Sequence, residues 1–264
     1  MGATGLSRTR FDARQTAIVT VLVGIALVGW LVIGRRMEGM DAGPGTDLGS
    51  LGFYVSAWVV MMAAMMFPSI APMVTTFSIV QRRRGAGGGR APVSSGLFVA
   101  GYLAIWTLFG LLAYAVLDLV RSLDVDAFSW ERGGRYLAGA VLLAAATYEL
   151  TPFKDVCLRK CRNPLGFVVS SWRDGRHGAV AMGAEHGAWC VGCCWALMAT
   201  LFALGVMSVG WMAFIAALVA AEKMLPWPRA TNLAIVTLLV VLAAGVTLAP
   251  DVVPGLTQPG SMSS

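Results

Sequence analysis

The chain has 264 residues, of which 57% are hydrophobic and only 13% are charged. A soluble domain carries about 25% charged residues, so the composition argues against an ordinary soluble enzyme or binding domain. The formal net charge is +6, but the basic residues lie in short segments between long apolar blocks. This distribution is typical of loops that set the orientation of a membrane protein, and it does not support a nucleic-acid-binding role.

The apolar blocks predict membrane spans, which we take in chain order. The first block covers residues 16–33 and has no small-residue cleavage site after it, so we expect an uncleaved span and not a signal peptide. The remaining spans are expected at residues 51–80, 94–117, 136–150, 178–204, 207–225 and 231–248. Together they predict an all-α, polytopic transmembrane helical bundle of about seven spans, or six if the first block is removed.

The polar ends of the chain predict two tails around a single domain. Residues 1–14 are expected to form a cytoplasmic N-terminal tail, residues 15–249 one transmembrane helical domain, and residues 250–264 a disordered C-terminal tail. With the N-terminus in the cytoplasm, most of the 20 Lys and Arg residues fall on the cytoplasmic side. This agrees with the positive-inside rule, so we expect that orientation.

The expected fifth span contains an unusual group of polar and sulfur-bearing residues, namely Glu185, His186, Cys190, Cys193 and Cys194. On a helix, the imidazole and the three thiols share an arc of about 100°. Such groups on one face of a membrane helix are costly unless they bind a ligand or one another. A metal site is one interpretation. The C-x-x-C spacing of Cys190 and Cys193 also permits a disulfide, and buried thiols can act simply as small apolar side chains.

The expected second span carries a band of thioethers. Its members are Met61, Met62, Met65, Met66 and Met73. Thioethers are soft ligands that suit Cu(I), and this band and the cysteines are expected near the same depth in the bilayer. Methionine also fills gaps beside a helix kink, and Pro68 and Pro72 predict a kinked or opened helix here. We expect Met62, Met65 and Met66 to be auxiliary ligands.

A second cysteine pair, Cys157 and Cys161, follows the fourth span. The i, i+4 spacing would place both thiols on one face if this segment is helical. Neighbouring Arg and Lys residues favour thiolates. The pair is interpreted either as a cytoplasmic entry or exit site for metal or as reduced thiols without a ligand.

Three carboxylates, Glu149, Glu185 and Glu222, are expected in the inner third of three different spans. They would form a carboxylate layer nearer the cytoplasm than the sulfur groups, which suits the binding or passage of a cation. The structural alternative for Glu222 is an ion pair with the adjacent Lys223 at a helix end, and Glu149 also lies near a helix end. Glu185 has no such explanation, because apolar residues surround it.

Several of these motifs occur in the same order in a family of uncharacterised bacterial proteins described as predicted metal-binding integral membrane proteins, which the chain resembles. The matching segments are residues 58–66 with Pro68, 148–154 with Cys157 and Cys161, 187–198, 205–212, and Glu222 and Lys223 with Pro226. The resemblance implies a multi-pass protein of the bacterial inner membrane, surrounded by lipid, that binds a metal. It implies no particular reaction.

The residues and the resemblance together favour a membrane protein that binds a soft transition metal, with copper as Cu(I) favoured over zinc, and that acts in metal handling or transport. The expected ligands are His186, Cys190, Cys193, Cys194, Met62, Met65 and Met66, with Cys157, Cys161, Glu185, Glu149 and Glu222 as further candidates. The expected partner is a metal chaperone or a membrane complex.

Two other functions stay open. The first is a membrane thiol oxidoreductase that uses Cys190 and Cys193, and the second is a structural or assembly subunit of a membrane complex. With only two histidines and no phosphate-binding loop, the chain offers no hydrolase triad, so we expect no catalytic residues.

Overall fold

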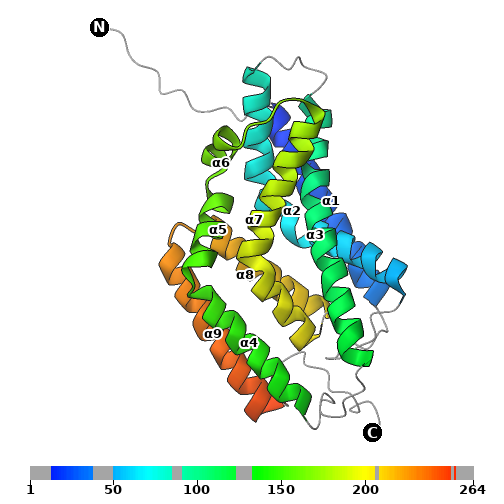
Figure 1. Ribbon diagram of the computed structural model, residues 1–264, viewed down its shortest axis with the longest axis vertical. Coiled ribbons are helices and arrows are strands. Elements are labelled where there is room, and N and C mark those ends of the chain that lie inside the picture. The colour runs from blue at the N-terminus through cyan, green and yellow to red at the C-terminus, as the bar shows by residue number, and fades with distance from the viewer. Residues whose placement is uncertain are drawn as a thin grey trace.

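The computed structural model describes residues 13–37, 50–84, 91–122, 133–205, 208–250 and 253, and over these residues the chain is helical without a strand. The helices are α1 Ala13–Met37, α2 Leu51–Arg83, α3 Ala91–Ser122, α4 Arg135–Glu149, α5 Pro152–Arg162, α6 Pro164–Ser170, α7 Gly175–Leu204, α8 Val209–Met224 and α9 Pro228–Leu248. Figure 1 shows an elongated bundle with α7 near its middle. The two expected tails lie almost entirely outside the described residues.

The apolar blocks predicted the long helices correctly, and polar residues at their ends explain where several begin. Ser50 caps α2 and Ser208 caps α8, each through its side-chain oxygen. Thr151 caps α5 and Pro152 follows at the first helical position, a pairing that starts a new helix and ends the previous one. α2 continues without interruption through Pro68 and Pro72, so these prolines do not open the helix as the sequence suggested.

Within the described residues, five helices are long and apolar enough to cross a membrane, namely α1, α2, α3, α7 and α9. A sixth span results if α4 and α5, which meet at a bend of 69°, are taken together. α8 corresponds to the expected span at residues 207–225 but has only 16 residues. The structure therefore supports a multi-pass membrane protein of five or six spans, and the expected count of seven is not confirmed.

α7 packs tightly against α3 because glycines face the neighbouring backbone. A Cβ atom added at Gly187 would lie 3.0 Å from the carbonyl oxygen of Tyr102. At Gly183 the clash would be more severe, because the carbonyl of Phe98 occupies the space. Small residues at helix contacts allow backbones in a membrane to approach closely. This approach brings the side chain of Tyr102 over the cysteine-bearing face of α7.

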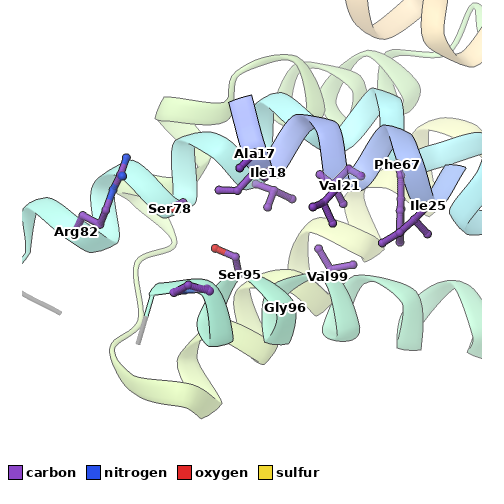
Figure 2. Close-up of a pocket in the computed structure, with 13 residues that line it drawn as sticks. Ala17, Ile18, Val21, Ile25, Phe67, Ser78, Arg82, Ser95, Gly96 and Val99 are labelled. Carbon is purple, nitrogen blue, oxygen red and sulfur yellow. The ribbon is translucent and has the colours of Figure 1, made fainter. Parts of the chain in front are cut away.

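A separate apolar groove of about 520 Å³ lies between α1, α2 and α3 (Figure 2). Ile18, Val21 and Ile25 of α1 line one wall, and Gly96 of α3 lies on the other. None of its lining residues is a cysteine, a histidine or a methionine. The groove is therefore distinct from the sulfur-bearing site described below.

We predict that Gly183→Ala lowers the melting temperature of the detergent-solubilised protein, because overpacking at a tight contact costs about 1–3 kcal/mol. Gly96→Ala is the matched control, since an added Cβ there meets no atom within 4 Å. Alanine favours a helix over glycine by about 1 kcal/mol, so the control should be neutral or slightly stabilising. Equal melting temperatures for the two variants would contradict the close contact between α3 and α7.

Candidate metal centre

Three cysteines from two helices bring their sulfur atoms together. The Sγ atoms of Cys161, Cys190 and Cys193 all lie within 4.8 Å of one another. Cys190 and Cys193 come from one face of α7, and α5 supplies Cys161, whose Sγ lies 3.7 Å from that of Cys193. All five cysteines of the chain are free thiols. The three-sulfur cluster, as we call Cys161, Cys190 and Cys193, is a set of soft ligands of the kind that binds Cu(I) or zinc.

A glycine explains how α5 reaches α7. A Cβ atom added at Gly192 would lie 2.7 Å from the Sγ of Cys157, so a larger residue would push α5 away. Cys157 is buried against this glycine and does not belong to the three-sulfur cluster. The predicted pair of Cys157 and Cys161 is thus divided: one thiol packs between the helices, and the other faces Cys193.

Lys223 and Tyr102 both contact the sulfur of Cys190. The ammonium of Lys223, on α8, donates a hydrogen bond to this Sγ over 3.1 Å and lies 3.4 Å from the hydroxyl of Ser69 on α2. The hydroxyl of Tyr102, on α3, lies 3.1 Å from the same sulfur. An ammonium group beside a sulfur favours negative charge there, and the thiolate is the form that binds metal. Five helices thus contribute a side chain to this site.

The other predicted sulfur ligands lie near the cluster or in the adjoining core. The Sγ of Cys194 is 3.2 Å from that of Cys193, but Cys194 is not part of the three-sulfur cluster. Met62, Met65 and Met66 are buried in α2, and Met65 and Met66 lie about one helical turn before Ser69. Because Ser69 contacts Lys223, Met65 and Met66 lie on the part of α2 that adjoins the site.

His186 is buried one helical turn before Cys190 and is surrounded by aromatic rings. The ring centroids of Phe98, Tyr102 and Phe167 lie 6.0, 5.8 and 5.2 Å from that of the imidazole. Its Nδ1 atom has no hydrogen-bond partner within the described residues. His186 is not a member of the three-sulfur cluster, although Tyr102 contacts both His186 and Cys190.

The three carboxylates have different partners in the structure. Glu149 and Glu222 are buried and both contact the ammonium of Lys154. Glu222 therefore pairs with Lys154 and not with the adjacent Lys223. Glu185 lies apart, where it accepts a hydrogen bond from Ser171 over 2.7 Å and forms a 3.0 Å ion pair with Arg173.

Sequence reasoning missed the two lysines and Tyr102 as parts of this region. The sequence did contain a signal for the lysines, because a charged residue beside an apolar segment of a membrane protein suggests a functional role. Lys154 and Lys223 both fit that description, but each is next to an acidic residue in the sequence, and an ion pair with that neighbour is a simpler explanation for its charge. Only the fold shows which partner each ammonium selects.

The polar character of α5 indicates the side from which the site is reached. Besides the buried Lys154, its 11 residues include Asp155, Arg159, Lys160 and Arg162. Hydrocarbon does not accommodate so many charges, so the outer face of α5 belongs beside water or lipid head groups. Cys161 is partly exposed on this helix, whereas the other four thiols are buried. The three-sulfur cluster is therefore approached along α5.

Comparison with known proteins gives a family match. A family model described as PpoB2: Copper chaperone matches residues 55–247, a range that contains the three-sulfur cluster, Lys154 and Lys223. Neither the curated proteins nor the solved structures include a significant match.

We predict that N-ethylmaleimide modifies Cys161 first when the metal-free, reduced protein is titrated in mild detergent, because the other four thiols are buried. Mass spectrometry of the peptides gives the rate at each cysteine. Cys157, on the same helix, is the internal control and should react at least about tenfold more slowly, as expected for a group that reacts only after local opening. Faster modification of Cys190 or Cys193 would contradict an approach along α5.

Proposed function

The chain belongs to the PpoB2 copper chaperone family, since the family model matches most of its length, and on this premise we propose that it is a membrane protein that binds Cu(I) and transfers it to a partner. The observation that carries the proposal is the three-sulfur cluster, in which no sulfur is further than 4.8 Å from another. Cys190 and Cys193 hold the ion from α7, and Cys161 completes the set from α5.

The composition of the cluster favours Cu(I) over zinc. Thiolates select soft ions, and Cu(I) accepts a site of two or three sulfurs, whereas structural zinc sites almost always have four ligands. A Cu(I) ion with three thiolates carries a net negative charge. The ammonium of Lys223, 3.1 Å from the sulfur of Cys190, offsets part of that charge inside the bundle.

The remaining predicted ligands take supporting roles in this proposal. Cys194 is the nearest reserve thiol, with its sulfur 3.2 Å from that of Cys193. Met62, Met65 and Met66 offer thioethers on α2 for an ion that has moved away from the cysteines. His186 offers its Nδ1 atom, which has no hydrogen-bond partner in the described part of the chain. Glu149 and Glu222 are engaged with Lys154, and Glu185 with Arg173, so the carboxylates serve the fold and not the ion.

Transfer begins at Cys161, because it is the ligand that lies on the accessible helix. A thiolate of a copper-carrying partner replaces or is replaced by this sulfur, while Cys190 and Cys193 retain the ion until the exchange is complete. No ATP-binding loop occurs in the sequence, so a partner or an ion gradient drives net transfer. We place the protein in the bacterial inner membrane with the N-terminus in the cytoplasm, as the distribution of basic residues favours.

The expected stoichiometry is one copper per chain after anaerobic loading with Cu(I) and desalting in detergent, measured by mass spectrometry of the metal. Cys190→Ser and Cys193→Ser should each lose most of the copper, because a hydroxyl is a poor ligand for a soft ion. Cys157→Ser is the matched control: this thiol is buried nearby but lies outside the cluster, so its copper content should equal that of the wild type.

Two results would overturn this proposal. One is a wild-type protein that retains no copper after loading; a disulfide among the cysteines would then favour the thiol oxidoreductase. The other is stoichiometric copper that survives in Cys190→Ser/Cys193→Ser, which would place the metal elsewhere in the chain.

A further inference from the structure

A buried group of three charges joins α5 to two other helices. The ammonium of Lys154, on α5, contacts the carboxylates of Glu149 at the end of α4 and of Glu222 near the end of α8. Lys154 is 0% exposed, and the two glutamates are 1% and 2% exposed. Burial of three charges is costly unless they pair with one another, so this geometry fixes the mutual positions of the three helices.

Only one face of α5 is buried in the bundle, where Cys157 packs against Gly192 of α7. Of its 11 residues, only Lys154, Cys157 and Leu158 are buried. It follows α4 across a bend of 69°, so α4 does not continue into it as a rigid rod. At its far end, the guanidinium of Arg162 donates a hydrogen bond to the backbone carbonyl of Glu222. Both ends of α5 are thus held by the same residue of α8.

These attachments govern the position of Cys161. Lys154, Cys157, Leu158 and Cys161 occupy positions i, i+3, i+4 and i+7 of α5, which lie on one face of a helix. The pairing of Lys154 therefore turns this face toward α7, where Cys161 reaches Cys193. On α8, the residue after Glu222 is Lys223, which contacts the sulfur of Cys190. Two consecutive residues of α8 thus position ligands from two different helices.

We propose that Lys154, Glu149 and Glu222 form an ionic latch, in which Lys154 is a positioning residue that holds Cys161 against Cys190 and Cys193 without touching the metal. Proteins often tolerate the replacement of a complete buried ion group by neutral residues of similar volume, so such a group adds little to the overall stability. The main contribution of the three charges here is to select one placement of α5. The consequence for copper rests on the proposed function, whereas the placement of Cys161 does not.

The direct test uses the triple variant Lys154→Met/Glu149→Gln/Glu222→Gln, which removes the three charges together and leaves no unpaired buried ion. In the metal-free protein, N-ethylmaleimide should modify Cys161 at least about tenfold faster than in the wild type, as expected when a local opening becomes more populated. Arg173→Gln is the control, because it breaks the ion pair with Glu185 and leaves α5 attached. Unchanged reactivity of Cys161 in the folded triple variant would overturn the latch.

If the triple variant does not fold, Glu222→Gln replaces it. Lys154 then keeps the carboxylate of Glu149, and its ion pair with the side chain on α8 is weakened to a hydrogen bond with an amide oxygen. The expected result is again faster modification of Cys161 than in Arg173→Gln. Equal rates in these two variants would overturn the latch.

The second readout is the affinity for Cu(I), measured by competition with a Cu(I)-specific chelator. The triple variant should bind copper about 10- to 100-fold more weakly, the usual effect of losing a group that orients a metal ligand. Adding Cys161→Ser to the triple variant should cause no further loss of Cu(I) affinity, because the triple variant and Cys161→Ser each remove the same ligand from the site. Losses that multiply would overturn the latch. A wild type without copper would overturn the proposed function, and the reactivity of Cys161 would still decide the latch.

Discussion

The arrangement of the candidate site depends on which groups face two lysine ammonium groups, that of the buried Lys154 and that of the half-buried Lys223. Lys154 has two carboxylates as partners, whereas Lys223 has the sulfur of Cys190 and the hydroxyl of Ser69. An ammonium inside a helical bundle is costly unless negative charge faces it, so the pairing of Lys223 favours a thiolate at the three-sulfur cluster. Lys223, whose ammonium contacts Cys190, and Glu222, whose carboxylate contacts Lys154 of α5, are consecutive residues of α8.

The sequence predicted the helices well and the site only in part. Long apolar blocks favour long helices, so the predicted spans begin and end within a few residues of the observed helices. The face of α7 that bears Cys190 and Cys193 follows from helical periodicity alone. The position of Cys161 beside Cys193 does not follow from periodicity, because it depends on the 69° bend after α4 and on a tertiary contact.

Glu222 and Lys223 show why adjacency in the sequence is a poor guide to pairing. Consecutive residues on a helix point about 100° apart, so they face different neighbours more readily than each other. Glu222 turns to Lys154 of α5, and Lys223 turns to Cys190 of α7. Glu185 likewise has apolar neighbours in sequence but polar ones in space, since Ser171 and Arg173 come from the segment before α7.

The proposed transfer of copper requires a site that binds the ion and still releases it, and in the three-sulfur cluster two thiols are buried and Cys161 is partly exposed. The central claim is that the three-sulfur cluster binds Cu(I), and X-ray absorption spectroscopy of the loaded protein tests it most directly. We predict a Cu(I) edge and a first shell of three sulfur atoms. A first shell dominated by nitrogen or oxygen would contradict a copper site built from Cys161, Cys190 and Cys193.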